Sequence, residues 1–257
     1  MQINKIIKMK DNKYKIIIDD ENIITYDNVI LDNELLYKKS IDNNLYKKIL
    51  LDTSYYDIYN KTVKYILKRR RSEKEIRNYL SKFDINNKNI ESIISKLKDI
   101  RLINDREYCK AYINDKLYLS KEGINKIKED LINENISIEE IEEELSNIDK
   151  FLFNQRLEKL IIKKINSNKK YSNSYLKQKI MSDMIGLGYD KDIILNILES
   201  NLSSDNKILE NELNKAYDKL KNKYNGYELE NKLKQRLVQK GFSVGQINTL
   251  LQKKTEE

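Results

Sequence analysis

Apolar residues recur along the chain at steps of 4, 5, 5 and 4 positions, and this pattern occurs four times. Successive copies begin 51, 53 and 53 residues apart. Repeats of this period are typical of arrays of small helical units, each of which shares its core with its neighbours. The pattern predicts tandem helical repeats and favours binding over catalysis. The four ladders are Ile76-Leu80-Ile85-Ile90-Ile94, Ile127-Leu131-Ile136-Ile141-Leu145, Ile180-Met184-Tyr189-Ile194-Leu198 and Leu233-Leu237-Phe242-Ile247-Leu251.

The centre of each ladder predicts a tight turn between two helices. A step of four places two apolar side chains on one helix face, and the two steps of five bracket the turn. The residue before the third apolar position of each ladder is of a type that tolerates the left-handed conformation that ends a helix: Asp84, Asn135, Gly188 and Gly241. The residue after it is a good N-cap: Asn86, Ser137, Asp190 and Ser243. The third apolar residue of each ladder is therefore expected to have a structural role, held in the turn between the two helices, which we call the elbow. These elbow residues are Ile85, Ile136, Tyr189 and Phe242.

A further amphipathic helix fits ahead of each pair, at roughly 57–70, 104–119, 154–167 and 206–224. The first residues differ, because 3–10 and 13–19 show period-two patterning and 23–26 fits a third strand. The segment from 27 to 60 looks helical and could cover this meander. We predict a mainly α protein, an elongated array of four tandem three-helix repeats with a small N-terminal β-meander and helical extension. The expected divisions are 1–59 (meander and cover), 60–103 (repeat 1), 104–150 (repeat 2), 151–203 (repeat 3) and 204–257 (repeat 4).

Composition argues against an enzyme. The chain has no histidine, which removes the usual general base and the commonest metal ligand, and it has no phosphate-binding glycine loop. We therefore expect no catalytic residue, no metal and no cofactor. The lone Cys109 fits a reducing compartment. No apolar run has the length of a membrane span, and the N-terminus lacks a signal-peptide core. A cytoplasmic protein without a membrane partner is expected.

Charge alternates between the repeats. Residues 60–103 hold 13 basic and 5 acidic side chains, whereas residues 104–150 hold 7 and 13. Residues 151–203 hold 9 and 5, and residues 204–257 hold 11 and 8. A simple duplex binder would keep one sign along its footprint, so the alternation favours a patterned partner such as a protein–nucleic-acid filament. Attraction between neighbouring repeats and plain solvated faces are the alternatives.

The densest basic run precedes a capping box formed by Ser72 and Glu75. Cations at a helix end complement its dipole, but three consecutive arginines exceed that need. We therefore predict a contact with phosphate or with an acidic protein surface. Tyr55 and Tyr59 interleave with lysines at helical spacing, which favours core packing over base stacking. Further basic strips lie in repeat 3, where solvated faces are the simpler interpretation. The candidate contact residues are Lys68, Arg69, Arg70, Arg71, Lys74, Arg77, Lys163, Lys164, Lys169 and Lys170.

The basic run also carries a family resemblance. Arg69-x-Arg71-Ser72-Glu73-x-Glu75-Ile76, followed by Leu97-x4-Leu102-Ile103-Asn104-Asp105 and Ala111-Tyr112, resembles the RecX family, regulators of the RecA recombinase. Lys121-Glu122-Gly123 resembles the start of that family's second repeat. The likeness covers about residues 60–147 and continues through the ladder to residue 251. It departs at Ile124 and Asn125, where the family often has proline and arginine, and at Asn135, where the family usually has glycine.

The resemblance implies a curved array of three-helix repeats that binds RecA and its filament on single-stranded DNA. It also implies inhibition of recombinase and co-protease activity, by blocking filament extension or promoting disassembly. End capping and groove binding both remain open, direct weak DNA binding is compatible, and a monomer is expected. Two alternatives stand beside this reading: a helical-repeat nucleic-acid-binding protein without a RecA target, and a self-associating helical scaffold. Charge reversal of Arg69 and Arg71 is expected to abolish inhibition and to leave thermal stability nearly unchanged.

Overall fold

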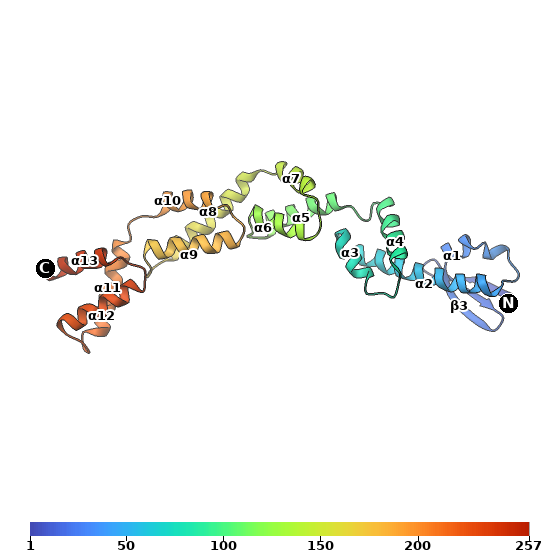
Figure 1. The fold of residues 1–257 in the computed structure, drawn as a ribbon, viewed down its shortest axis with the longest axis horizontal. Helices are drawn as coiled ribbons and strands as arrows, with labels where there is room; N and C mark the ends of the chain where they lie inside the picture. Colours follow the sequence, from blue (N-terminus) through green and yellow to red (C-terminus); the bar gives the residue numbers. More distant parts are fainter. Residues whose placement is uncertain (257) are drawn as a thin grey trace. The chain divides into compact units, whose positions relative to one another are not determined.

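The computed structural model describes residues 1–256, and side chains up to residue 253. The chain forms two compact units, and Figure 1 shows the order of their elements. The first unit contains Met1–Lys110 together with Glu134–Ile136, and the second contains Ala111–Asn133 together with the described residues from Ser137 onward. Both are mainly helical, as the sequence predicts, and the first also carries the predicted small sheet.

The N-terminal sheet is an antiparallel meander of three strands, β1 (Ile3–Lys8), β2 (Lys13–Ile18) and β3 (Glu21–Tyr26). Asp11 and Asn12 turn between β1 and β2 at φ 59 and 56, a conformation that these residue types tolerate. Ile16 is fully buried and Ile18 is 2% exposed, so one face of the sheet carries the core. The third strand begins two residues earlier than the pattern suggests.

Helix α2 (Asn43–Ile66) joins the sheet to repeat 1, after α1 (Asp27–Asp32) and a short 3-10 turn (Leu35–Tyr37). Its first half contributes Ile49 to the core beneath the sheet, and its second half contributes Ile66 to the core of repeat 1. The expected division after residue 59 falls inside this helix, because one apolar face serves both cores. Tyr55 and Tyr59 pack partly buried against these cores, which confirms the packing interpretation.

The repeats consist of three helices each, as predicted, with α2 acting as the first helix of repeat 1. In every repeat the apolar ladder spans the second and third helices. Among the described residues, no helix is long and apolar enough to cross a membrane. The remaining helices are α3 (Glu73–Leu80) and α4 (Asn87–Asp99) in repeat 1, α5 (Asp105–Leu119), α6 (Ile124–Asn133) and α7 (Ile138–Ser146) in repeat 2, α8 (Lys150–Ser167), α9 (Asn173–Gly186) and α10 (Lys191–Asn201) in repeat 3, and α11 (Asn206–Leu220), α12 (Gly226–Val238) and α13 (Val244–Glu256) in repeat 4.

Three of the four elbows have the predicted left-handed residue: Asn135, Gly188 and Gly241 have φ 63, 86 and 89. Their elbow residues are buried, with Ile136 4%, Tyr189 6% and Phe242 2% exposed.

The prediction for Asp84 is wrong, because Asp84 is not in the left-handed region. Helix α3 ends at Leu80, four positions before Asp84, so the chain turns through a longer loop. Ile85 is only half-buried as a result.

The N-caps follow the sequence prediction. The side chains of Asn86, Ser137 and Asp190 accept backbone hydrogen bonds at the start of α4, α7 and α10. Ser72 and Glu75 form the complete capping box at the start of α3. These bonds satisfy backbone N–H groups that the helix itself leaves unpaired.

Neighbouring repeats meet at corresponding places three times, through a side-chain hydrogen bond in the first case and backbone hydrogen bonds in the other two. The start of the second helix of one repeat touches the elbow of the next. The Ser72 hydroxyl donates to Glu134 at 2.5 Å, the Gly123 backbone N–H to Leu187 O at 2.7 Å, and the Ser172 backbone N–H to Lys240 O at 3.0 Å. In the Gly123 contact, a Cβ on Gly188 would lie 2.3 Å from the Lys126 backbone nitrogen. Glycine is required at Gly188 both for its left-handed backbone and for this close approach.

Candidate functional site

The arginine run lies in the loop between α2 and α3, beside the loop between α4 and α5. Together these loops form a groove of about 560 Å³, here called the arginine groove. Four arginines line it, and apolar side chains from α2, α5 and the intervening loop complete it. The lining is Arg69, Arg70, Arg71 and Arg101 with Ile66, Leu67, Leu102, Asn104, Glu107 and Tyr108. Of the predicted contact residues in repeat 1, Lys68, Lys74 and Arg77 are not part of the lining.

Arg71 is packed into repeat 1. Its side chain is 13% exposed, and its guanidinium carbon lies 4.0 Å from the centre of the Tyr65 ring. Tyr65 in turn stacks on Tyr79, with ring centres 4.1 Å apart. One guanidinium nitrogen donates to Glu75 at 3.4 Å, and its Nε is buried without a hydrogen-bond partner. This arginine holds the start of α3 against the end of α2.

Arg69 faces the same carboxylate from a more exposed position. Its two terminal nitrogens donate to the two oxygens of Glu75, at 2.5 and 3.2 Å, and its side chain remains 54% exposed. Such a two-pronged pair is the geometry in which a guanidinium recognises a carboxylate. Arg69 is therefore oriented by Glu75 and still accessible.

Arg77 belongs to a separate network on α3 and α4. It pairs with Glu73 at 2.7 Å and with Glu91 at 2.6 Å, and Lys98 pairs with Glu73 at 2.5 Å. The hydrogen bond to Glu91 is the main reason that the pKa of Arg77 is raised. Burial alone would raise the pKa of the Glu73 carboxyl, but Lys98 and Arg77 outweigh it and lower that pKa. Arg77 is paired within repeat 1 and does not line the arginine groove.

Arg70 and Arg101 are the most available cations of the groove. Arg70 is 62% exposed and pairs at 3.0 Å with Glu107, which is 54% exposed itself. Arg101 is exposed and stands at φ 58, in the left-handed position that ends α4. The backbone N–H groups of Arg101 and Leu102 donate to Lys98 O and Leu97 O, the bonding of a Schellman motif. Sequence reasoning missed Arg101, because this position is usually occupied by glycine and nothing in the ladder marks it.

Repeat 3 carries the second basic surface, at the end of α8 and the start of α9. Two adjoining hollows of about 780 and 250 Å³ share Ser167 and Lys169. We call their lysines the lysine surface. Lys164 pairs with Asp183 at 2.5 Å, and the other members form no ion pair among the described residues. The members are Lys159, Lys163, Lys164, Lys169, Lys170 and Lys179.

An aromatic pair borders this surface. Lys170 lies 4.8 Å from the centre of the Tyr171 ring, and Tyr171 stacks on Tyr175 with ring centres 4.6 Å apart. Tyr175 is 38% exposed. The structure thus brings together the four predicted lysines of repeat 3 and adds Lys159, Lys179 and this aromatic pair.

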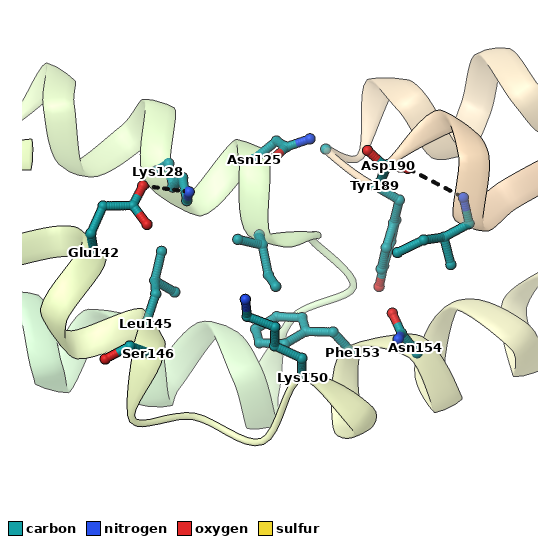
Figure 2. A pocket seen from close by; sticks show the side chains of 13 residues that line it. Asn125, Lys128, Glu142, Leu145, Ser146, Lys150, Phe153, Asn154, Tyr189 and Asp190 are labelled. Carbon is teal, nitrogen blue, oxygen red and sulfur yellow. Dashed lines mark hydrogen bonds and ion pairs between the residues drawn. The ribbon is translucent and has the colours of Figure 1, made fainter.

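A smaller pocket lies at the contact between repeats 2 and 3 (Figure 2). Its volume of about 180 Å³ is below the usual range of ligand pockets. Lys128 and Glu142 pair at 2.6 Å on one side, and Phe153 and Tyr189 lie on the other. We interpret it as a packing space at the repeat contact.

Arg156 is a basic residue whose guanidinium is used inside the fold rather than left for a partner. It donates to the backbone oxygens of Lys116, Leu117, Ser120 and Glu122, at 2.5 to 3.1 Å, and its Nε to the Tyr189 hydroxyl at 3.2 Å. It therefore holds the end of α5 and the loop that follows through their backbone carbonyl groups. Sequence reasoning missed this role, since the partners lie more than 30 residues away.

Comparison with known proteins decides the family. A profile described as "RecX, third three-helix domain" matches residues 205–251, which form repeat 4 of this chain. The protein named "Regulatory protein RecX" of Bacillus cytotoxicus is 31% identical over 234 residues, covering 89% of this chain and 86% of that protein. The protein of the same name from Bacillus cereus strain G9842 is 31% identical over 267 residues, covering 97% and 96%. The chain belongs to the RecX family.

Solved RecX structures share the fold. One, titled "Crystal structure of regulatory protein RecX", aligns with a TM-score of 0.68 at 20% identity, covering 77% of this chain and 98% of that chain. RecX from Lactobacillus salivarius aligns with a TM-score of 0.52 at 28% identity, covering 57% and 95%. The resemblance predicted from the basic run and the ladder is confirmed, and so is the mainly helical fold. The RecX family is one of regulatory proteins, which is the role assigned to this chain.

Proposed function

We propose that this chain binds RecA and RecA filaments on single-stranded DNA and inhibits recombinase and co-protease activity, without catalysing a reaction itself. The observation that carries the proposal is membership of the RecX family along nearly the whole chain. Inhibition would arise from blocking filament extension or from promoting disassembly. The chain would act as a monomer that contacts both components of the filament.

The two basic surfaces support a partner made of protein and nucleic acid. The arginine groove combines cations with apolar side chains, whereas the lysine surface carries mostly unpaired ammonium groups. Ammonium groups without carboxylate partners suit the regularly spaced phosphates of a strand. Exposed Glu139, Glu142 and Glu143 on α7 add a third, acidic surface, so the charge pattern matches a partner that is itself patterned.

The geometry sharpens the choice of contact residues. Arg71 and Arg77 are committed to packing and ion pairs, so reversing their charge would disturb repeat 1 itself. Arg69, Arg70 and Arg101 keep exposed guanidinium groups. Charge reversal of Arg70 and Arg101 is therefore a cleaner test of inhibition than reversal of Arg69 and Arg71.

The direct test is the DNA-dependent ATPase activity of the host's own RecA on single-stranded DNA. The protein is added after filaments have formed, at a series of ratios to RecA. We expect progressive loss of ATPase activity. Loss at ratios far below one molecule per RecA supports capping of filament ends, while loss only near an equimolar ratio supports binding along the groove of the RecA filament. No effect at equimolar protein would contradict the proposal.

A second candidate is direct nucleic-acid binding without a RecA target, which the unpaired lysines of repeat 3 favour. It predicts tight binding to single-stranded DNA alone, with affinity that falls steeply with salt. Fluorescence anisotropy of a labelled oligothymidylate across a salt series separates the two. Tight binding without any effect on RecA would favour this candidate.

A further inference from the structure

We propose that the arginine groove of repeat 1 binds an acidic segment of a partner protein that also presents an apolar side chain. The inference deepens the proposed function and rests on it for the existence of a protein partner. It adds the chemical class of the ligand at this groove and a residue, Arg101, that the sequence pattern does not mark.

The groove has an apolar component that a phosphate site does not need. Leu67 is 69% exposed at the end of α2, and the half-buried Leu102 lies across the same hollow. Ile66 and Tyr108, which are 6% and 8% exposed, complete this side. Covering an exposed leucine with another apolar side chain is favourable, whereas a sugar–phosphate chain would leave that gain unused. The lining therefore fits a peptide better than a nucleic acid.

The arginines already hold carboxylates at this place. Arg70 pairs with Glu107, and Arg69 engages Glu75 through two nitrogens. These pairs show that the guanidinium groups stand in orientations suited to single carboxylates. Glu75 and Glu107 also reduce the net positive charge of the loop, which weakens the counterion release that drives nucleic-acid binding. An acidic side chain of a bound peptide, in contrast, needs only one free guanidinium as its partner.

Arg101 supplies that free guanidinium. Its side chain is exposed and forms no ion pair among the described residues. Its backbone is left-handed, which is unfavourable for a residue with a side chain and natural for glycine. A non-glycine residue in such a strained position at the edge of a groove is typical of functional sites. We assign Arg101 as the main carboxylate-binding residue of the groove.

The test uses fluorescence anisotropy with three labelled probes. The first is a short glutamate-rich peptide with two leucines, the second replaces both leucines by serine, and the third is an oligothymidylate. The variants are Arg101→Gly, Arg70→Ala and Leu67→Ser, with Lys163→Ala from the lysine surface as the matched control. Arg101→Gly is the sharpest variant, because glycine adopts the same left-handed backbone, so the turn is kept while the side chain and its guanidinium are removed.

We expect the leucine-containing peptide to bind at least tenfold more tightly than the serine peptide. Arg101→Gly should weaken peptide binding about tenfold with thermal stability preserved, and Leu67→Ser should remove the preference for leucine. Lys163→Ala should weaken only the oligothymidylate. If the groove variants weaken the oligothymidylate and leave the peptide unchanged, the groove is a phosphate site and the proposal fails.

Two further readouts keep the outcomes distinct. If neither peptide binds while the protein still inhibits the RecA ATPase, the groove assignment falls and the proposed function stands. If the peptide binds through Arg101 but the ATPase is unaffected, the groove assignment stands and the RecA target falls. Analytical ultracentrifugation checks for a second copy of this chain as the occupant. Self-association that Arg101→Gly abolishes would overturn the assignment to another protein.

Discussion

The arginine groove and the lysine surface occupy the same place in two repeats, yet their cations are used differently. Both lie where the first helix of a repeat ends and the second begins, between α2 and α3 in repeat 1 and between α8 and α9 in repeat 3. In repeat 1, Arg69 and Arg71 share Glu75, and Arg71 packs against the Tyr65 ring. Of the lysines that form the lysine surface in repeat 3, only Lys164 has a carboxylate partner within the described part of the chain. A repeated fold can thus present two different arrangements of cations at one position.

The difference follows from the two side chains. A guanidinium is planar, binds carboxylates through two nitrogens and stacks on aromatic rings, so it can be built into a loop. An ammonium is compact and strongly hydrated, so it gains little from such packing and stays in water. Arginines in repeat 1 are therefore built into the fold as well as available for the proposed binding, whereas most lysines of the lysine surface remain available for the proposed phosphate contacts.

The largest expected effect separates the two regions by stability. Arg71→Ala removes the contact with Tyr65 and leaves Glu75 with one cation fewer, so it should lower the free energy of unfolding by about 2–3 kcal/mol. Lys163→Ala in the lysine surface should change it by less than about 0.5 kcal/mol. Urea unfolding followed by circular dichroism measures both. Equal effects at the two positions would remove the distinction between packed arginines and free lysines.

The next effect concerns nucleic acid. The double variant Lys163→Glu, Lys169→Glu should weaken binding to single-stranded DNA about tenfold or more and reduce the salt slope by about 1.4, as expected for two lost phosphate contacts. Lys177→Glu is the matched control, because Lys177 lies on α9 of the same repeat and already pairs with Glu199. Anisotropy of labelled oligothymidylate at several salt concentrations gives both quantities. An unchanged salt slope would show that these lysines do not touch phosphate.

A smaller effect appears at acid pH. Lys98 and Arg77 hold the pKa of Glu73 below its usual value, so the folded state gains stability from Glu73 at pH values above the unfolded pKa. This contribution is lost as pH falls through the folded pKa. Glu73→Gln should remove it, with a change below about 1 kcal/mol because both partners are partly exposed.

Unfolding midpoints measured between neutral pH and pH 3 give the readout for Glu73. The matched control is Glu199→Gln in repeat 3, an exposed carboxylate 3.4 Å from Lys177. Because this pair is exposed, the substitution should change the free energy of unfolding by less than about 0.5 kcal/mol. Identical acid profiles for the wild-type protein and Glu73→Gln would rule out a stabilising role for this network.

The smallest effect concerns the exposed pair between Arg70 and Glu107. Both side chains are more than half exposed, so a double-mutant cycle with alanine should give a coupling energy near or below 0.5 kcal/mol. Weak coupling means that Glu107 can release Arg70 to an incoming carboxylate at little cost. Thermal unfolding of the two single variants and the double variant measures it. A coupling well above 1 kcal/mol would place Arg70 with the structural arginines.

Local patterns were sufficient for most of the fold. The repeated ladder identifies the second and third helices, and the left-handed elbows at Asn135, Gly188 and Gly241 follow from residue types that tolerate positive φ. The N-cap residues could also be read directly, because a cap is a bond within three residues of chain. The prediction of a left-handed turn at Asp84 failed, since the end of α3 at Leu80 depends on packing in repeat 1 rather than on a short motif.

Only part of the candidate site could be predicted from the sequence. The sequence marks the arginine run but does not reveal that Arg71 packs against Tyr65 while Arg70 remains exposed. It also cannot place Arg101 beside this run, because the two loops that form the groove are about thirty residues apart. Arg156 looks like another surface cation until its contacts with the end of α5 are known.

What the sequence alone determined is the repeat architecture: helices, caps and three of the elbows, all of which depend on interactions within a few residues along the chain. Tertiary structure decided which cations are available, because Arg77 and Arg156 find partners on other helices, whereas Arg101 forms no ion pair among the described residues. The physical reason is how far apart along the chain the interacting residues lie. Helix periodicity and capping are local, whereas the burial and pairing of a long charged side chain depend on whichever segments the folded chain brings within a few ångströms of it.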